Sequence, residues 1–207
     1  MVLEKFRKSP EVLPIYNYID VVNGLGYITF YAVVTKDSSG QDEILTPNVL
    51  WSNDIFTSKI CDQDALKQYV DYDWDASPFS VPKSIKGVMD IQLPWNAISA
   101  LGVETGYVVF KVRKWDGATE TEIASVQSET IDNSPTVTGK VSLLKLDIPE
   151  THFKKGEILR ITQELWMTSS GFGSADAFHL YHDPKDRLAS GDLYTTILKF
   201  NIPFKIN

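Results

Sequence analysis

The sequence predicts an all-β protein, an antiparallel β-sandwich of the jelly-roll type with very little helix. Three observations lead to this class. Apolar and polar residues alternate in several stretches of the 207-residue chain, as expected of strands with one buried face. Turn-forming residues separate these stretches, and only residues 62–70 show a short helical pattern. About eight to ten strands at this spacing are typical of a sandwich, and jelly rolls commonly have this number.

The alternation defines the predicted strands in order along the chain. In the last of them, apolar residues at every second position from Leu198 to Ile206 share one face, and Pro203 lies on the other. Because proline cannot donate a ladder hydrogen bond, Pro203 predicts that this strand lies at or near a sheet edge. The alternating stretches are residues 28–34, 85–95, 107–115, 158–167 and 197–206.

Asp116-Gly117 marks the clearest turn, between the β-prone stretches 107–115 and 118–126. An Asp-Gly pair in this setting is a strong hairpin signal, because both central residues of a type I′ turn need a positive φ. The two stretches are therefore predicted to form a hairpin through a type I′ turn.

No internal repeat, linker or change in composition divides the chain, so residues 16–207 are predicted to form a single β-sandwich domain. Residues 1–15 are charged and interrupted by proline, without a strand period, which predicts an extended N-terminal arm. Phe6, Val12, Leu13 and Tyr16 are the candidate anchors of this arm in an interface.

Composition excludes several classes of protein. The net charge is −7 and the pI is about 5.0, so no direct binding to nucleic acid is expected, since phosphate neutralisation needs clustered Lys and Arg. The single cysteine, Cys61, excludes an internal disulfide and a multi-cysteine zinc site. No apolar stretch has the length of a signal-peptide core or a membrane helix, which predicts a protein made in a cytoplasm with no membrane partner.

The stretch YVDYDWDAS, residues 69–77, is the part of the chain most suggestive of chemistry. As an EF-hand loop beginning at its first aspartate, it would need glycine at the sixth position and an acid at the twelfth, but Ala76 and Pro82 stand there. Tyr72 and Trp74 alternate with the acids, as in a strand with rings on one face and carboxylates on the other. We interpret the stretch as a strand, with a calcium site at loop ends as the alternative.

His179 and His182 are the strongest candidates for metal ligands, but Pro184 argues against a helix that would put them on one face. In a strand, residues three apart point to opposite faces and cannot hold one metal ion. Residues 177–181 are therefore predicted to form a strand that ends in an Asp-Pro turn, without a metal site. His152 is interpreted as a solvated loop residue.

Signatures of catalysis are missing from the sequence, which has no G-x-S-x-G elbow, H-E-x-x-H helix, P-loop or dinucleotide fingerprint. Cys61 has no histidine near it in the sequence and is expected to pack as a small apolar residue. Paired carboxylates of the kind that hydrolyse glycosides stay open, because such pairs come together from distant positions. The sequence therefore predicts no enzyme and no cofactor, and it names no catalytic or metal-binding residue.

Five tryptophans raise the alternative of sugar binding, because exposed rings on a sandwich can stack on glycans. Trp95 falls on the apolar face of its strand, and Trp166 falls on the opposite face of another. Packing in a core or an interface is the usual role of tryptophan, so Trp166 is predicted to lie on an outer face or in an interface.

The C-terminal segments KKGEILRITQELW, YHDPKDR and IPFKI, within residues 150–207, resemble small β-sandwich virion proteins of tailed double-stranded DNA viruses. The shared features are strand and turn patterns without a chemical signature, so no residue role carries over. The resemblance implies a jelly-roll protein that decorates or reinforces a capsid, or that belongs to a tail or fibre, usually as a symmetric oligomer.

We therefore expect a non-enzymatic virion structural protein, foremost a capsid decoration protein assembled in the host cytoplasm. Its expected partners are copies of itself in a symmetric homo-oligomer and the major capsid protein or other virion proteins. The arm and Trp166 are the expected interface. A carbohydrate-binding β-sandwich module is the alternative, with a glycan as its partner.

Overall fold

A computed structural model describes residues 25–36, 40–61, 65–98, 104–133, 138–169, 177–188 and 195–205. Within these residues every regular element is a strand, so the predicted all-β class is confirmed. Among them no helix is long and apolar enough to cross a membrane. The strands are β1 (Leu25–Lys36), β2 (Gln41–Thr46), β3 (Phe56–Ile60), β4 (Lys67–Ala76), β5 (Lys83–Ile98), β6 (Glu104–Trp115), β7 (Glu120–Gln127), β8 (Ile131–Asn133), β9 (Thr138–Phe153), β10 (Ile158–Ser169), β11 (Ala177–Tyr181) and β12 (Lys199–Lys205).

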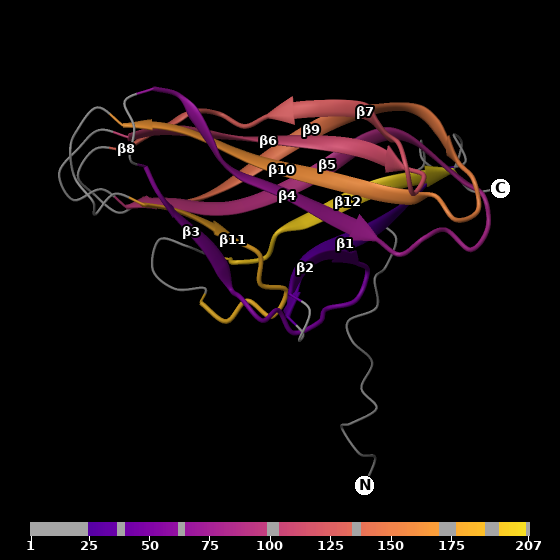
Figure 1. Cartoon of the computed structure of the whole chain (residues 1–207), viewed down its shortest axis with the longest axis horizontal. Coiled ribbons are helices and arrows are strands. Elements are labelled where there is room, and N and C mark those ends of the chain that lie inside the picture. Colours follow the sequence, from indigo (N-terminus) through magenta and orange to yellow (C-terminus); the bar gives the residue numbers. More distant parts are fainter. Residues whose placement is uncertain are drawn as a thin grey trace, which may run out of the picture.

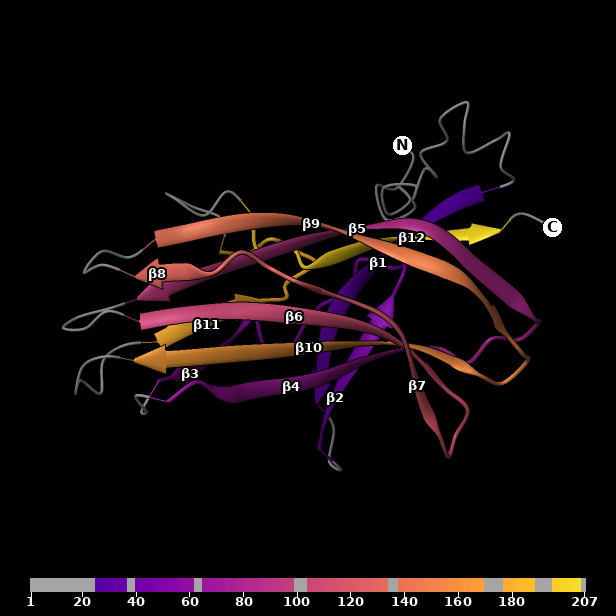
Figure 2. The ribbon, with the colours of Figure 1, turned by 90° about the horizontal axis from the view of Figure 1, so that it is seen from above.

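The strands form one continuous hydrogen-bonded sheet that folds over on itself. Its order is β3-β11-β5-β12-β1-β2-β4-β10-β6-β7, with β8 paired to β6 and β9 paired to β5. Figure 1 shows β4, β10, β6 and β7 along one side of the molecule and β3, β11, β1 and β2 along the other. Figure 2 shows β6, β10 and β4 side by side on the first of these sides. Most pairings are antiparallel, and the arrangement is the predicted jelly-roll-like sandwich.

Aromatic side chains fill the core between the two sides. The ring centroids of Phe110 on β6 and Phe200 on β12 lie 5.5 Å apart with their planes at 78°, an edge-to-face contact that joins strands distant in the sheet order. The apolar residues of the alternating stretches thus pack together in one core. The largest fully buried aromatic side chains are Trp74, Trp95, Phe110, Phe153, Phe178 and Phe200.

The strand predicted over YVDYDWDAS is confirmed as β4. Val70 and Trp74 are buried, whereas Asp71 between them is exposed on the opposite face. The rings and the carboxylates therefore separate as the period of two requires.

The predicted edge position of the C-terminal strand is wrong, because β12 lies between β1 and β5. The pairing of β12 with β5 shifts register between Asn201 and Phe204. Pro203 falls in this irregular stretch, where the ladder toward β5 is already interrupted. A proline is therefore tolerated inside the sheet here, as it is at bulges generally.

The hairpin at Asp116-Gly117 is confirmed and joins β6 to β7, but its turn is not type I′. Gly117 has a φ of +96°, and Asp116 does not share the positive φ that type I′ would require of it. The loop runs to Thr119 and is closed by a 3.3 Å hydrogen bond from the Asp116 amide to the Thr119 carbonyl. Asp116 Oδ1 also accepts hydrogen bonds from the amides of Ala118 and Thr119, so the aspartate side chain shapes this longer turn.

The short helical pattern at residues 62–70 gives no helix in its described part. β4 begins at Lys67, and the following residues pair with β10. Tertiary pairing overrides a weak local preference here, as is common for short segments.

The predicted arm, residues 1–15, lies outside the described residues. The same is true of its candidate anchors, Phe6, Val12, Leu13 and Tyr16. The arm and the domain boundary at residue 16 stay predictions.

Candidate functional site

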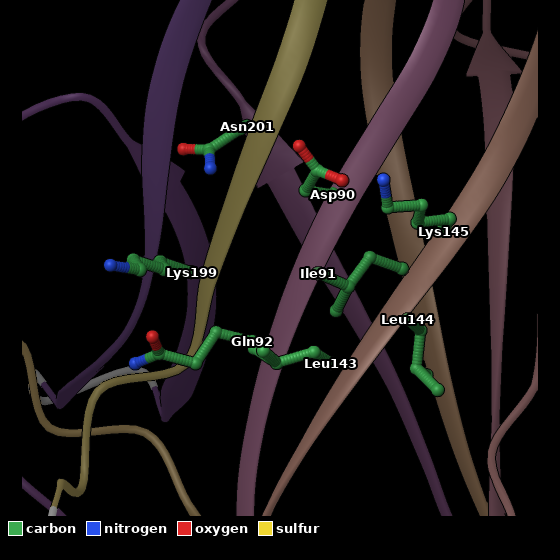
Figure 3. A pocket seen from close by; sticks show the side chains of 8 residues that line it. All are labelled: Asp90, Ile91, Gln92, Leu143, Leu144, Lys145, Lys199 and Asn201. Carbon is green, nitrogen blue, oxygen red and sulfur yellow. The ribbon is translucent and has the colours of Figure 1, made fainter.

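A groove of about 240 Å³ crosses the outer face of β9, β5 and β12 (Figure 3). Outward side chains from two cross-strand rows line it. Ile91 and Leu144, which lie between the rows in sequence, are buried and also contribute to its lining. The first row is Asn201, Asp90 and Lys145, and the second, two residues along each strand, is Lys199, Gln92 and Leu143.

Hydrogen bonds orient the two amide side chains of the groove. Asn201 Oδ1 accepts a 2.8 Å hydrogen bond from Thr29 Oγ1 on β1. Gln92 Nε2 donates a 3.0 Å hydrogen bond to the carbonyl of Ile197. The groove therefore keeps the Asn201 Nδ2 group as a donor and the Gln92 Oε1 atom as an acceptor for a ligand.

The charges in the groove are held apart. Asp90 and Lys145 are register partners on β5 and β9, yet among the described residues no ion pair joins them. At the other end of the same three strands, Lys86 and Lys205 contact Glu150 at 3.2 and 2.6 Å. The strand geometry thus permits ion pairs across these strands, and Asp90 and Lys145 nevertheless do not form one.

The chemistry of this lining suits a small polar ligand with an apolar portion. Asp90 is an acceptor for a cationic group, and charge-assisted hydrogen bonds of this kind are about twice as strong as neutral ones. Leu143 is 78% exposed and offers apolar contact beside it. Among the described residues that line the groove there is no aromatic ring, which does not favour sugar stacking there.

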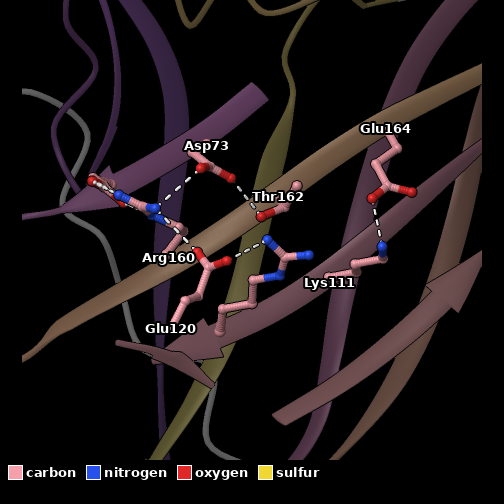
Figure 4. A network of polar contacts seen from close by, with 8 residues as sticks. Asp73, Lys111, Glu120, Arg160, Thr162 and Glu164 are labelled. Carbon is pink, nitrogen blue, oxygen red and sulfur yellow. Dashed lines mark hydrogen bonds and ion pairs between the residues drawn. The ribbon is translucent and has the colours of Figure 1, made fainter. Parts of the chain in front are cut away.

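A charged face covers the outer side of β4, β10, β6 and β7 (Figure 4). Its centre is the Arg160 guanidinium, which donates to both oxygens of Asp75 at 2.6 and 2.7 Å. It also donates to Asp73 and Glu120, both at 3.0 Å. Hydrogen bonds from Arg160 to Asp75, together with the nearby charges, raise the pKa of Arg160. The remaining members of the charged face are Asp71, Lys111, Arg113, Thr162 and Glu164.

Two register partners on this face have pKa values shifted in opposite directions. Burial raises the pKa of Glu164, but hydrogen bonds from Lys111 and Trp166 more than offset this and hold it below its usual range. Burial and the neighbouring carboxylates of Asp73 and Glu164 raise the pKa of Asp71. Most of the charges on the face are paired, which indicates that it stabilises the sheet.

Replacing Arg160 by methionine should lower the free energy of unfolding by about 1–3 kcal/mol at neutral pH, the usual cost of losing hydrogen bonds to charged groups. The loss arises because Asp75, Asp73 and Glu120 would face one another without the guanidinium. Urea denaturation measures it, with Lys86→Met in the exposed Glu150 pair as the control expected to change little. Equal effects of the two variants would contradict a central role of Arg160.

His152 is exposed as predicted but lies in β9 and not in a loop, with its Nδ1 3.1 Å from Ser84 Oγ. The two candidate metal ligands, His179 and His182, lie in different surroundings. The predicted strand at residues 177–181 is confirmed as β11, and the His179 ring stacks on Phe56 with centroids 4.5 Å apart. His182 lies past the end of the strand, buried, with Nε2 3.2 Å from Thr57 Oγ1. Within the described part of the chain no three His, Cys, Asp or Glu side chains are grouped so as to hold a metal ion.

Trp166 lies half-buried on the outer face, and its Nε1 donates a 3.0 Å hydrogen bond to Glu164. This agrees with the predicted outward orientation, while its role in an interface stays a prediction. Trp95, by contrast, is fully buried in the core. Sequence reasoning missed the groove, because Asp90 and Gln92 stand out only as the polar half of an ordinary alternation.

No family model matches the chain, and no curated protein matches it. Solved structures share its fold. One is an aminopeptidase from a marine sediment archaeon, Thaumarchaeota archaeon, with a TM-score of 0.53, 11% identity, and coverage of 88% of this chain and 37% of that one. Another is an α-amino acid ester hydrolase, with a TM-score of 0.51, 12% identity, and coverage of 86% and 36%. The chain therefore spans little more than a third of each of these proteins.

A structure of infectious bursal disease virus also matches, at 8% identity over 88% of this chain and 57% of that one, but its TM-score of 0.26 is too low to carry an argument. The predicted virion structural function and the expectation of a non-enzymatic protein are both contradicted, because the structures with the better likeness are hydrolases. Strand and turn patterns of residues 150–207 are shared by β-sandwiches in general, so of the viral resemblance only the all-β fold is confirmed. The homo-oligomer and the glycan partner stay predictions.

Proposed function

We propose that the chain is the β-sandwich part of a hydrolase acting on substrates with a free α-amino group, and that the groove binds this group. The observation that carries the proposal is the Asp90 carboxylate, which has no ion-pair partner among the described residues and lies in a lined groove. The aminopeptidase and the α-amino acid ester hydrolase support it, because a substrate with an α-amino group is common to both names.

The groove has the acceptors that an ammonium group needs. An ammonium donates three hydrogen bonds, and Asp90 and Gln92 both point outward from β5, two residues apart and about 6.6 Å along the strand. Figure 3 shows the Gln92 amide directed away from Asp90, so the Asp90 carboxylate is the acceptor for the ammonium group. The Gln92 nitrogen donates to the Ile197 carbonyl, which leaves the Gln92 oxygen as a further acceptor in the second row.

Binding of L-leucine methyl ester, followed by NMR chemical-shift changes, tests the proposal. Replacing Asp90 by asparagine removes the charge and keeps the shape, so the Kd should rise about 10-fold or more, the usual effect of losing a charge-assisted hydrogen bond. N-acetyl-L-leucine methyl ester, which has no ammonium, should bind as weakly to the unaltered protein as the amino ester binds to the variant.

Asp42→Asn is the matched control, because Asp42 is an exposed aspartate on β2, outside the groove lining. It should leave the Kd unchanged. In an enzyme that contains this chain, Asp90→Asn should also raise the KM for the ester. Equal binding of the amino and the N-acetyl ester, or an unchanged Kd in Asp90→Asn, would contradict the proposal.

A further inference from the structure

The groove holds a positive charge beside its negative one. Asn201, Asp90 and Lys145 form one row across three strands, with neighbouring strands about 4.8 Å apart. Figure 3 shows the Lys145 amino group directed toward Asp90 and the Lys199 amino group directed away from it. Lys145 has no ion-pair partner among the described residues, so its charge is available to a ligand.

The volume of the groove limits the size of the ligand. Pockets for drug-sized molecules measure about 300–1,000 Å³, so a groove of about 240 Å³ suits a smaller molecule. The ligand must carry a cationic group for Asp90 and an anionic group for Lys145 at short separation. The exposed Leu143 in the second row adds an apolar contact for an aliphatic side chain.

Hydrolysis of an α-amino acid ester or of a peptide creates this combination of charges. Water adds to the acyl carbon, and the bond to the leaving alcohol or amine breaks as that group takes one proton of the water. The new carboxyl group gives its proton to the solvent and ends as a carboxylate. The ester carries only the ammonium charge, whereas the released amino acid carries both. Lys145 therefore distinguishes the product from the substrate, because only the product has a carboxylate on the carbon that bears its ammonium group.

We propose that the groove binds free α-amino acids as zwitterions, with Asp90 taking the ammonium and Lys145 the carboxylate. This rests on the proposed function and deepens it, since the groove would hold the amino acid product more tightly than the ester substrate.

NMR titrations with L-leucine and L-leucine methyl ester at pH about 6, where the α-amino group is protonated, test the proposal. Leucine should bind about 10-fold more tightly than its ester, the usual effect of one additional charge-assisted hydrogen bond. Lys145→Met should abolish this difference and leave the Kd for the ester within about twofold. Lys86→Met is the matched control, because Lys86 is an exposed lysine on β5 outside the groove lining and its loss should preserve the difference.

The outcomes separate the two proposals. If the ester binds in an Asp90-dependent way and leucine binds no more tightly, the zwitterion proposal fails and the proposed function stands. An equal preference for leucine in Lys145→Met and in the unaltered protein would also overturn it. If Asp90→Asn changes the Kd of neither ligand, both proposals fail. Thermal melting of each variant confirms that a lost affinity is not a lost fold.

Discussion

Replacing Trp74 by alanine is expected to lower the free energy of unfolding by about 3–5 kcal/mol, the range for a fully buried tryptophan. The side chain is 0% exposed, and its ring contacts those of Tyr72 and His182, with centroids 5.8 and 5.6 Å away. Its Nε1 donates a 3.1 Å hydrogen bond to Oε1 of the buried Gln163. The alanine variant would leave both a cavity and an unsatisfied amide.

Urea denaturation at neutral pH measures this loss, and two further variants locate its cause. Trp74→Phe keeps a ring and loses the hydrogen bond to Gln163, so its cost should be smaller, about 1–3 kcal/mol. Trp51→Ala is the matched control, because Trp51 is 65% exposed and contacts Arg187, whose guanidinium lies 4.2 Å from the ring centroid. Such an exposed contact contributes about 0.5–1 kcal/mol. A loss below that of Trp51→Ala would show that Trp74 is not a main part of the core.

Stability is expected to fall as the pH is lowered from 6.5 toward 4, because of His182. Burial lowers the pKa of His182 from 6.5 to about 4 in the folded protein. Between these values the unfolded chain binds a proton that the folded protein does not, so the free energy of unfolding decreases as the pH falls. The stabilisation that comes from the neutral His182 is complete above pH 6.5, and about 3 kcal/mol of it is lost between pH 6.5 and pH 4.

The surroundings of His182 explain this shift. Trp74 on β4 covers its ring, Thr57 on β3 lies against Nε2, and Nδ1 has no hydrogen-bond partner among the described residues. The nearby carboxylates of Asp54 and Asp183 oppose the shift, and burial outweighs them. A proton on the ring would therefore place a charge where the loss of hydration costs more free energy than the two carboxylates supply.

Denaturation of the unaltered protein and of His182→Gln across this interval tests the prediction. The variant keeps a polar side chain that does not titrate. Its free energy of unfolding, relative to that of the unaltered protein, should therefore rise by about 3 kcal/mol as the pH falls from 6.5 to 4. His179→Gln is the comparison variant. Burial also lowers the pKa of His179, but this ring is only half-buried, so a smaller change is expected. Parallel curves for the unaltered protein and His182→Gln would refute the assignment.

Local patterns in the sequence predicted the elements well where one face is buried. In YVDYDWDAS the position of Trp74 among the aspartates was enough to assign inward and outward sides, because successive side chains of a strand point to opposite faces whatever its neighbours are. The position of the Asp116-Gly117 turn was predicted because the preference of an Asp-Gly pair for a turn is also a local property. The type of this turn was not predicted, because the Asp116 side chain accepts hydrogen bonds from two backbone amides in a longer loop.

The functional prediction was wrong because strand and turn patterns do not specify chemistry. Arg160 and its three carboxylates come from β10, β4 and β7, and no spacing in the sequence indicated that they would meet. Nothing in the sequence indicated a binding role for Asp90, since a single aspartate on a strand is an ordinary solvent-facing residue.

The sequence by itself determined the all-β class and which side of each strand faces the core, because the period of two is a local property of the backbone. Tertiary structure alone decided which strands are neighbours. It placed Pro203 inside the sheet at an interruption of the ladder, and it aligned Asn201, Asp90 and Lys145 in one row. Register between distant strands depends on long-range pairing and on how the two halves of the core fit together, and it is this register that brings the side chains of the groove together.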